Sequence, residues 1–329
     1  MRELIENLNE NQPEPMYTQN DEPKTAKTKS AKKPEQTAPN ELQVSKTYKL
    51  FIGGAFPRTE SGRYFPINDS QGRFLANVCR GSRKDFRNAV VAARKAQSGW
   101  QDRSAYNKSQ ILYRLAEMLQ QKKDLFVKEM RDMGLAKNRA EVEFATAVDL
   151  LVYYAGWCDK YIQVFSAVNP VASSHFNFSV PEPTGVVVAV SSNDSPLTGI
   201  VQAIAPGIAG GNTVVALASE PYPLTAITFS EVIATSDVPA GVVNILTGKR
   251  EELMHHFATH MDVNALVAWD VGKSEARKIG QDAAENVKRV HFYKTVKIET
   301  GGPHYILDLQ EIKTTWHPIE NIKGSGSGY

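Results

Sequence analysis

Short hydrophobic runs alternate with helical segments in the second half of the chain, from Phe176 onward. Runs rich in β-branched residues lie at 185–191, 213–217, 242–246, 265–268 and 290–292. Between them, segments 196–209, 222–235, 251–259 and 273–285 space their hydrophobic residues as helices with one apolar face do. This alternation is typical of βαβ units, and it predicts an α/β fold with a parallel sheet and flanking helices.

The first half of the chain predicts short strands followed by helices. Extended segments are expected at 48–54, 64–68 and 73–79. A helix is expected at 85–98, and Ser104 can cap a longer helix whose hydrophobic residues run from Ile111 to Phe126. A third helix is expected over 139–164.

The two ends of the chain differ in composition from the middle. Residues 1–45 contain few large hydrophobic residues, which predicts a disordered tail. Five lysines between Lys24 and Lys33 fit a solvated linker or a docking tag. Residues 311–329 include a Gly/Ser run and are expected to form a flexible C-terminal tail, which leaves 46–310 as the folded domain.

Charge and composition exclude several classes of partner. The chain has 38 Lys and Arg against 36 Asp and Glu, a net charge of +2 that gives no reason to expect a nucleic-acid partner. No apolar stretch approaches the ~20 residues that span a bilayer, so no membrane partner is expected. The two cysteines, Cys79 and Cys158, fit buried free thiols in a reducing compartment, which predicts a cytoplasmic protein.

No G-x-G-x-x-G motif follows a predicted strand, but several longer blocks occur in a fixed order. They are EPTGVV at 182–187, Asn193, IAP at 204–206, AGGNTVV at 209–215, SE at 219–220, PAGVVN at 239–244 and TG at 247–248. Together they resemble the aldehyde dehydrogenase superfamily over about residues 49–290. The resemblance implies a Rossmann-type NAD(P)-binding domain with a small β oligomerisation element.

The resemblance also implies positions for the site. Asn193 takes the position of the asparagine that donates to the oxyanion, as a vestigial catalytic residue; the alternative is a cap for the helix near Pro196. NAD or NADP would be held by Ser191, Ser219, Glu220, Gly248 and Gly272, and Glu220 would accept from the adenosine ribose. Gly272 with Lys273 fits either a phosphate contact or an ordinary helix cap.

The chain departs from the family pattern at the positions that carry chemistry. A lysine near the ribose is Leu217, a turn glycine is Val271, and Asp270 adds negative charge where phosphates would lie. The general-base glutamate is Tyr293, and the segment that carries the catalytic cysteine in the family is expected to be absent. NAD(P) binding is therefore expected to be weakened or lost.

Two further features bear on binding. His255, His256 and His260 fit a solvent-facing helix end or, less simply, a metal site with Asp262. Residues 176–180 and 304–309 are expected to be strands that pair with another chain.

Three functions fit these observations. The leading hypothesis is an auxiliary or pseudoenzyme subunit that forms a homo-oligomer or pairs with a full-length aldehyde dehydrogenase. The alternatives are an NAD(P)-dependent oxidoreductase active only with a partner chain, and a nucleotide-binding sensor.

Overall fold

The computed structural model describes residues 46–295 and 301–319. The chain divides into two units, Met1–Val44 and Ser45–Tyr329. The predicted tail at 1–45 lies outside the described residues. The fold below is that of the second unit.

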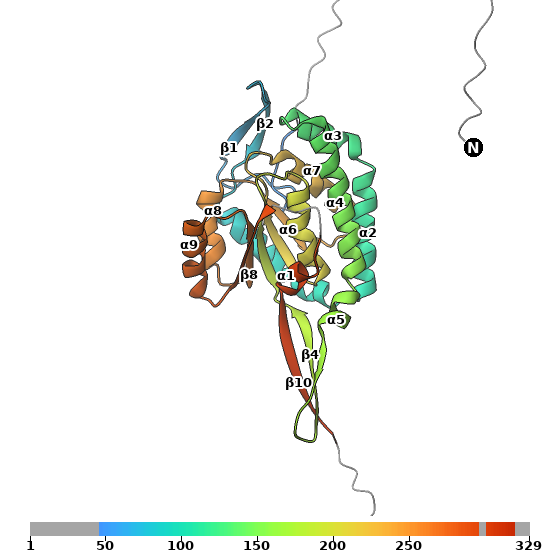
Figure 1. Cartoon of the computed structure of the whole chain (residues 1–329). Coiled ribbons are helices and arrows are strands. Elements are labelled where there is room, and N and C mark those ends of the chain that lie inside the picture. Colours follow the sequence, from blue (N-terminus) through green and yellow to red (C-terminus); the bar gives the residue numbers. More distant parts are fainter. Residues whose placement is uncertain (1–45, 296–300, 320–329) are drawn as a thin grey trace, which may run out of the picture. The chain divides into compact units, whose positions relative to one another are not determined.

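A five-stranded parallel sheet lies at the centre of this unit (Figure 1). Its strand order is β7-β6-β5-β8-β9, so the chain starts in the middle and winds outward in both directions. The strands are β5 (Val186–Val190), β6 (Thr213–Leu217), β7 (Val243–Leu246), β8 (Ala265–Trp269) and β9 (Arg289–Tyr293). The predicted α/β fold and its five strands are confirmed.

Helices cover both faces of the sheet, which explains why the strand sequences are hydrophobic throughout. Val187 and Ala189 of β5 belong to one core cluster, whereas Val186, Val188 and Val190 point into another. The first cluster includes side chains of α6 (Thr198–Ala209) and α7 (Leu224–Thr235). The second includes side chains of α1 (Arg83–Gln101), α8 (Arg250–Thr259) and α9 (Lys273–Ala284).

A second layer of helices packs outside α6. These helices are α2 (Ala105–Gln120), α3 (Lys123–Asp132), α4 (Lys137–Trp157) and α5 (Lys160–Phe165). Ser104 caps α2 as predicted, but the helix does not continue to Phe126. The Lys122 N–H turns back to the Leu119 carbonyl, so Phe126 lies in α3. The predicted helix over 139–164 is likewise interrupted after Trp157, at Cys158 and Asp159.

The N-terminal strands β1 (Tyr64–Asn68) and β2 (Phe74–Cys79) form an antiparallel hairpin. The Asp69 carboxylate accepts the backbone N–H groups of Gln71 and Arg73, both at 2.8 Å. Gly72 supplies the positive φ of 80° that closes the turn. Both predicted strands are confirmed.

A three-stranded antiparallel sheet projects beyond the helices (Figure 1). Its order is β10-β4-β3, with β3 (Ala167–Asn169), β4 (His175–Pro183) and β10 (Gln310–Pro318). The predicted strand at 176–180 is part of β4.

Two predictions near the C-terminus are wrong. Residues 304–309 do not form a strand, because the short helix α10 (His304–Leu307) begins after Pro303. The N–H groups of Ile306 and Leu307 both donate to the Pro303 carbonyl at 3.1 Å. Residues 311–318 are not a flexible tail either, because they pair with β4 as part of β10.

The helices within 46–295 and 301–319 include none that has both the length and the hydrophobicity to cross a bilayer.

Candidate functional site

The carboxyl ends of the five parallel strands meet at one edge of the sheet, where ligands bind in folds of this kind. Two of the predicted residues, Ser191 and Ser219, are buried there and already hydrogen-bonded. The Ser191 hydroxyl donates to the Leu217 carbonyl at 2.8 Å, and the Ser219 hydroxyl donates to the Asn193 carbonyl at 3.3 Å. The Ser191 hydroxyl therefore connects the loop after β5 to the end of β6, and the Ser219 hydroxyl connects the loop after β6 to the loop after β5.

Asn193 is exposed on the loop after β5. Its side-chain oxygen accepts the backbone N–H of Glu220 at 3.0 Å. The cap residue of α6 is Leu197, and no side chain caps that helix, so the helix-cap interpretation of Asn193 is wrong. The contact orients the amide, and only its NH₂ end is left to donate to an oxyanion.

The Glu220 carboxylate is also engaged within the chain. One oxygen forms an ion pair with Lys249, and the other lies 3.4 Å from the backbone nitrogen of Arg250. A ribose hydroxyl at this position would share the carboxylate with Lys249.

The two predicted glycines differ in surroundings. A Cβ on Gly248 would lie 3.2 Å from both the backbone nitrogen of Gly81 and the Leu253 side chain, so Gly248 permits close packing. Gly272 is the cap residue at the start of α9, and a Cβ there would meet no atom within 4 Å.

A pocket of about 380 Å³ opens beside these loops, between α8 and α9. Asn193 and Glu220 line it together with Arg250, Met254, Glu275 and Ile279, among others. This volume lies within the range of sites for small molecules.

Arg250 is the residue of this pocket that the sequence did not single out. Its guanidinium donates to Glu275 at 3.0 Å and to the Trp269 carbonyl at 3.1 Å. The second terminal nitrogen, Nη2, is buried and has no hydrogen-bond partner. A buried donor of this kind is costly unless a ligand oxygen accepts from it. The sequence feature that could have indicated Arg250 is its position as a cation two residues after Gly248, at the start of a helix.

Asp270 occupies the loop after β8 with a positive φ of 55°. Its carboxylate accepts from the Ser192 hydroxyl and from the Thr295 backbone N–H, both at 2.9 Å, and the Thr295 hydroxyl also contacts it. Asp270 thus ties together the ends of β5, β8 and β9. It places a carboxylate, rather than anion-binding N–H groups, at this edge.

Tyr293 ends β9 at the same edge. Its hydroxyl donates to the Asp308 carboxylate at 2.7 Å, and its ring packs against Trp269 and Tyr305. Burial, together with the Asp308 hydrogen bond and charge, raises the pKa of Tyr293. The phenol therefore stays protonated at neutral pH.

The two thiols of the chain are buried and distant in sequence from the strand ends. Burial raises the pKa of the Cys79 thiol, and it raises that of Cys158 to about 12. Neither is a thiolate at neutral pH, so neither has the reactive form that nucleophilic catalysis needs.

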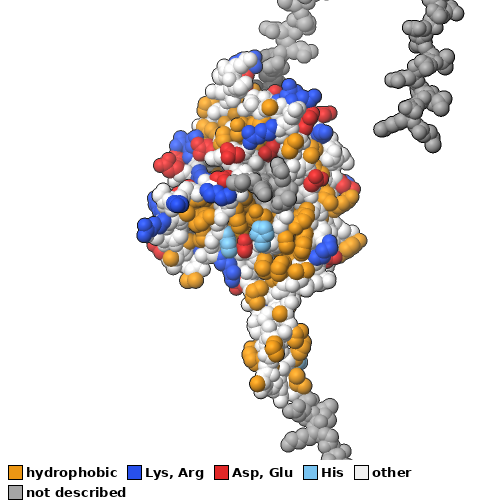
Figure 2. Space-filling view, viewed as in Figure 1, with side chains coloured by type: hydrophobic (Ala, Val, Ile, Leu, Met, Phe, Trp, Pro, Cys, Tyr) orange, Lys and Arg blue, Asp and Glu red, His pale blue; other side chains and the backbone are white. Residues whose placement is uncertain are grey.

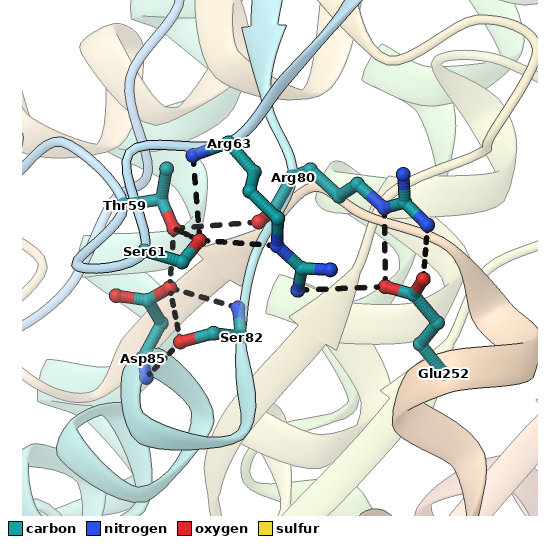
Figure 3. A network of polar contacts seen from close by, with 7 residues as sticks. All are labelled: Thr59, Ser61, Arg63, Arg80, Ser82, Asp85 and Glu252. Atoms are coloured by element: carbon teal, nitrogen blue, oxygen red, sulfur yellow. Dashed lines mark hydrogen bonds and ion pairs between the residues drawn. The ribbon is translucent and has the colours of Figure 1, made fainter.

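A polar network joins α1 and α8 to the hairpin behind this edge (Figure 3). Arg80 forms a two-pronged ion pair with Glu252 of α8, and Arg63 lies 3.6 Å from the same carboxylate. The hydrogen bond and charge of Arg80 lower the pKa of Glu252. Asp85 accepts from Thr59 at 2.7 Å and from the Ser82 backbone at 2.8 Å. The network holds the first turns of both helices in place.

The histidines near the end of α8 do not form a metal centre in the described part of the chain. No group of three or more His, Cys, Asp or Glu residues is arranged there to hold a metal ion. The His255 ring instead contacts Asp282 at 2.9 Å.

Comparison with known proteins places this geometry in a family. The model of the aldehyde dehydrogenase family matches residues 57–308. DhaS of Bacillus subtilis (strain 168), which carries the name of an aldehyde dehydrogenase, is 31% identical over 272 residues, 81% of this chain and 53% of that protein. The mitochondrial benzaldehyde dehydrogenase of Antirrhinum majus is 32% identical over 259 residues, 77% of this chain and 47% of that protein.

Solved structures agree on the fold. The structure of 3,6-anhydro-L-galactose dehydrogenase in complex with NAP superposes with a TM-score of 0.71 at 21% identity, over 75% of this chain and 52% of that one. The chain spans about half the length of the relatives that it matches. The extent of the family match and these identities establish that the chain belongs to the aldehyde dehydrogenase family.

Proposed function

We propose that this chain is an auxiliary member of the aldehyde dehydrogenase family that does not turn over an aldehyde by itself. The observation that carries the proposal is Tyr293, at the position where the family resemblance implies the general-base glutamate. A base must have a proton-accepting form at working pH. The Tyr293 hydroxyl instead donates to Asp308, and its raised pKa keeps it protonated.

The remaining polar groups at the strand ends support the same proposal. The Asp270 carboxylate accepts hydrogen bonds from the Ser192 hydroxyl and the Thr295 backbone, so it is engaged within the chain. The two cysteines of the chain are protonated thiols, because burial raises the pKa of each. Since both are free rather than disulfide-bonded, we place the protein in the cytoplasm.

Steady-state assays with NAD or NADP and a panel of short aldehydes test this function. We expect no turnover above the rate without protein. Turnover that the Asn193→Ala variant abolishes would overturn the proposal. The Lys95→Ala variant, changed on the exposed surface of α1, controls for general effects of substitution.

Nucleotide binding is a second candidate function, favoured by the α8–α9 pocket. Arg250 offers the buried Nη2 donor, and Glu220 offers acceptors for ribose hydroxyls. These residues fit the adenosine end of NAD or NADP, whereas Asp270 opposes a pyrophosphate at the neighbouring loop. We therefore infer that NAD or NADP binds with lower affinity than a site with an intact pyrophosphate loop would give. When bound, the dinucleotide would supply a hydride acceptor. This candidate includes both a sensor and an oxidoreductase completed by a partner chain.

Calorimetric titration with adenosine, NAD and NADP tests this second candidate. If the adenosine end alone is accommodated, adenosine should bind about as tightly as NAD. Arg250→Met should weaken both by about tenfold, because it removes the unpaired donor. Binding of NAD much tighter than that of adenosine would contradict a pyrophosphate site lost to Asp270.

We further propose that the three-stranded sheet pairs with a second subunit, either another copy or a full-length aldehyde dehydrogenase. Figure 2 shows hydrophobic side chains along this projecting sheet. Ile312 and Trp316 of β10 are 53% and 56% exposed, and Phe176 of β4 is 45% exposed. Among the strands within 46–295 and 301–319, β10 pairs only with β4, so its other edge can accept a further strand.

Light scattering after gel filtration tests the copy–copy form of this proposal. We expect a dimer or larger oligomer for the wild type and dissociation for Trp316→Asp. Tyr106→Asp, a matched change of an exposed aromatic residue on α2, should leave the mass unchanged. A monomeric wild type that also fails to bind a full-length enzyme would contradict the proposal.

A further inference from the structure

A second pocket of about 380 Å³ lies on the other side of α8, facing the start of α1. Arg83 and Arg87 from α1 line one wall, spaced four residues apart and so one helical turn from each other. His256 and His260, also four residues apart, line the wall from α8 and its C-cap. An arginine pair on α1 thus faces a histidine pair on α8 and its C-cap across the pocket, and the two members of each pair lie one helical turn apart.

The charges of this pocket are not balanced by acids in its walls. Its lining residues include Lys84 but no Asp or Glu. Lys84 is paired with Glu60, whereas the described residues provide no hydrogen-bond or ion-pair partner for Arg83 or Arg87. Ion pairing therefore leaves both guanidinium groups available to an anion.

The placement of the arginines is unfavourable for the helix that carries them. Arg83 and Arg87 lie in the first two turns of α1, at the positive end of the helix dipole. The capping box of Ser82 and Asp85 already satisfies that end of the helix. Helix stability therefore gives no reason for these cations, whereas a bound anion would be attracted by both the guanidinium groups and the dipole.

An aromatic floor completes the pocket. Phe86 is fully buried beneath the cations and packs on Phe257, with ring centroids 4.6 Å apart. His260 meets the same ring edge-on at 5.4 Å. Beneath the pocket the packing is thus apolar, and no acid lies among its lining residues to compete with a bound anion.

We propose that this α1–α8 pocket binds a phosphorylated small molecule, with its phosphate between Arg83, Arg87 and His256. Guanidinium and imidazolium groups form charge-assisted hydrogen bonds to phosphate oxygens. The site is separate from the α8–α9 pocket, and its occupation requires neither an aldehyde nor a nicotinamide dinucleotide.

Binding is expected to take up protons. The pKa of His256 is lowered by burial and by the charges of Arg83 and His255, and that of His260 is lowered by burial and by Lys288 and Arg83, against an opposing effect of Asp262. A phosphate dianion would offset the repulsion from Arg83 and raise both pKa values. Affinity should therefore increase as the pH falls toward the ordinary histidine pKa of 6.5, and should stop rising below about pH 6, where the phosphate dianion is itself protonated.

Proton–carbon NMR of the histidine rings, during titration of the full chain with phenyl phosphate, tests the proposal. We expect saturable shifts of the His256 and His260 resonances and none of His291 or His304. Inorganic phosphate should produce the same shifts with lower affinity, and phenol should produce none. Shifts with phenol alone would reject the phosphate class.

Charge variants distinguish specific binding in this pocket from general electrostatic attraction between the protein and the phosphate. Arg87→Glu should weaken phenyl phosphate at least about tenfold and leave the melting temperature unchanged or higher. Lys95→Glu, the same charge change on the same helix but outside the pocket, should leave the affinity within about twofold. Equal losses in both variants, or no histidine shift in the wild type, would overturn the proposal. NAD should not compete, so a failure here is distinct from a failure of the proposed function.

Discussion

At the scale of single residues, the strand-end groups are occupied by contacts within the chain. The Asn193 side-chain oxygen accepts the backbone N–H of Glu220, and the Glu220 carboxylate forms an ion pair with Lys249. The Tyr293 hydroxyl donates to the Asp308 carboxylate. The contacts of Glu220 and Tyr293 use groups that cofactor binding or base catalysis would otherwise require, whereas the Asn193 contact leaves its NH₂ group free to donate. The tyrosine contact is the most direct of these, because it fixes both the position and the protonation of the side chain.

The Tyr293 hydrogen bond should contribute measurably to stability. Tyr293→Phe removes a donor to a carboxylate and leaves Asp308 with His291 at 3.8 Å. We expect the free energy of unfolding, measured with urea, to fall by about 1.5–3 kcal/mol. Tyr305→Phe, whose ring packs against Tyr293, serves as the control and should cost less than about 1 kcal/mol. Equal effects of the two substitutions would contradict this role.

Glu129 should make stability depend on pH. This buried carboxyl accepts from Tyr48 at 2.6 Å and from Thr228 at 2.8 Å, yet burial raises its pKa above the ordinary value of 4.5. Because the folded state favours the protonated form, its stabilising contribution is complete below pH 4.5 and is lost as the pH rises through the raised pKa.

Urea unfolding across this pH range measures that contribution. The unfolding free energy of the wild type minus that of Glu129→Gln should decrease with rising pH. The same difference for Glu117→Gln, an exposed carboxyl paired with Arg114, should stay nearly constant. A flat difference for Glu129→Gln would contradict the raised pKa.

Site residues could be predicted from the sequence where a local motif marks their position. Residues whose role depends on contacts between distant parts of the chain were missed. The positions of Asn193, Glu220 and Tyr293 followed from the order of the motif blocks. Arg250 was missed because its importance depends on contacts with Glu275 and Trp269, which follow it by 25 and 19 positions. Pairwise contacts of this kind leave no local pattern in a sequence.

At the scale of elements, the start of α1 depends on one buried carboxylate. Asp85 is 3% exposed and accepts hydrogen bonds from Thr59 and Ser82 (Figure 3). It also accepts the backbone N–H of Glu60 at 3.0 Å. Asp85→Ala should lower the unfolding free energy by about 2–4 kcal/mol, because buried N–H and O–H groups lose their acceptor. Asp124→Ala, in the exposed first turn of α3, should lower the unfolding free energy by less than about 1 kcal/mol. Thermal or urea unfolding of both variants measures the two losses.

The elements of the central sheet could be predicted because two-sided burial makes them hydrophobic throughout. Helix interruptions at Lys122 and at Cys158–Asp159 escaped prediction, because the hydrophobic periodicity continues across both breaks. The failure at 304–309 has a similar origin. Residues 304–309 are a short, mostly apolar run after a Gly-Gly-Pro turn, as a strand often is, but Pro303 starts a helical turn, and the strand begins at Gln310.

At the scale of the whole molecule, α8 separates two pockets of equal volume. The α8–α9 pocket carries Glu220 and Arg250 at the strand ends, and the α1–α8 pocket carries the arginines of α1. The three-stranded sheet projects from the end of this unit opposite the β1–β2 hairpin (Figure 1). Binding at the two pockets and pairing through the sheet can therefore be tested by separate variants.

A single-turnover experiment with the chain in excess over the aldehyde tests the central claim most directly. NAD or NADP is supplied at saturating concentration, and reduction of the nicotinamide is followed by absorbance. The protonated, Asp308-bound Tyr293 predicts no reduction above the rate without protein, in the wild type and in Asn193→Ala alike. Reduction equivalent to the aldehyde added, and lost in Asn193→Ala, would contradict the account.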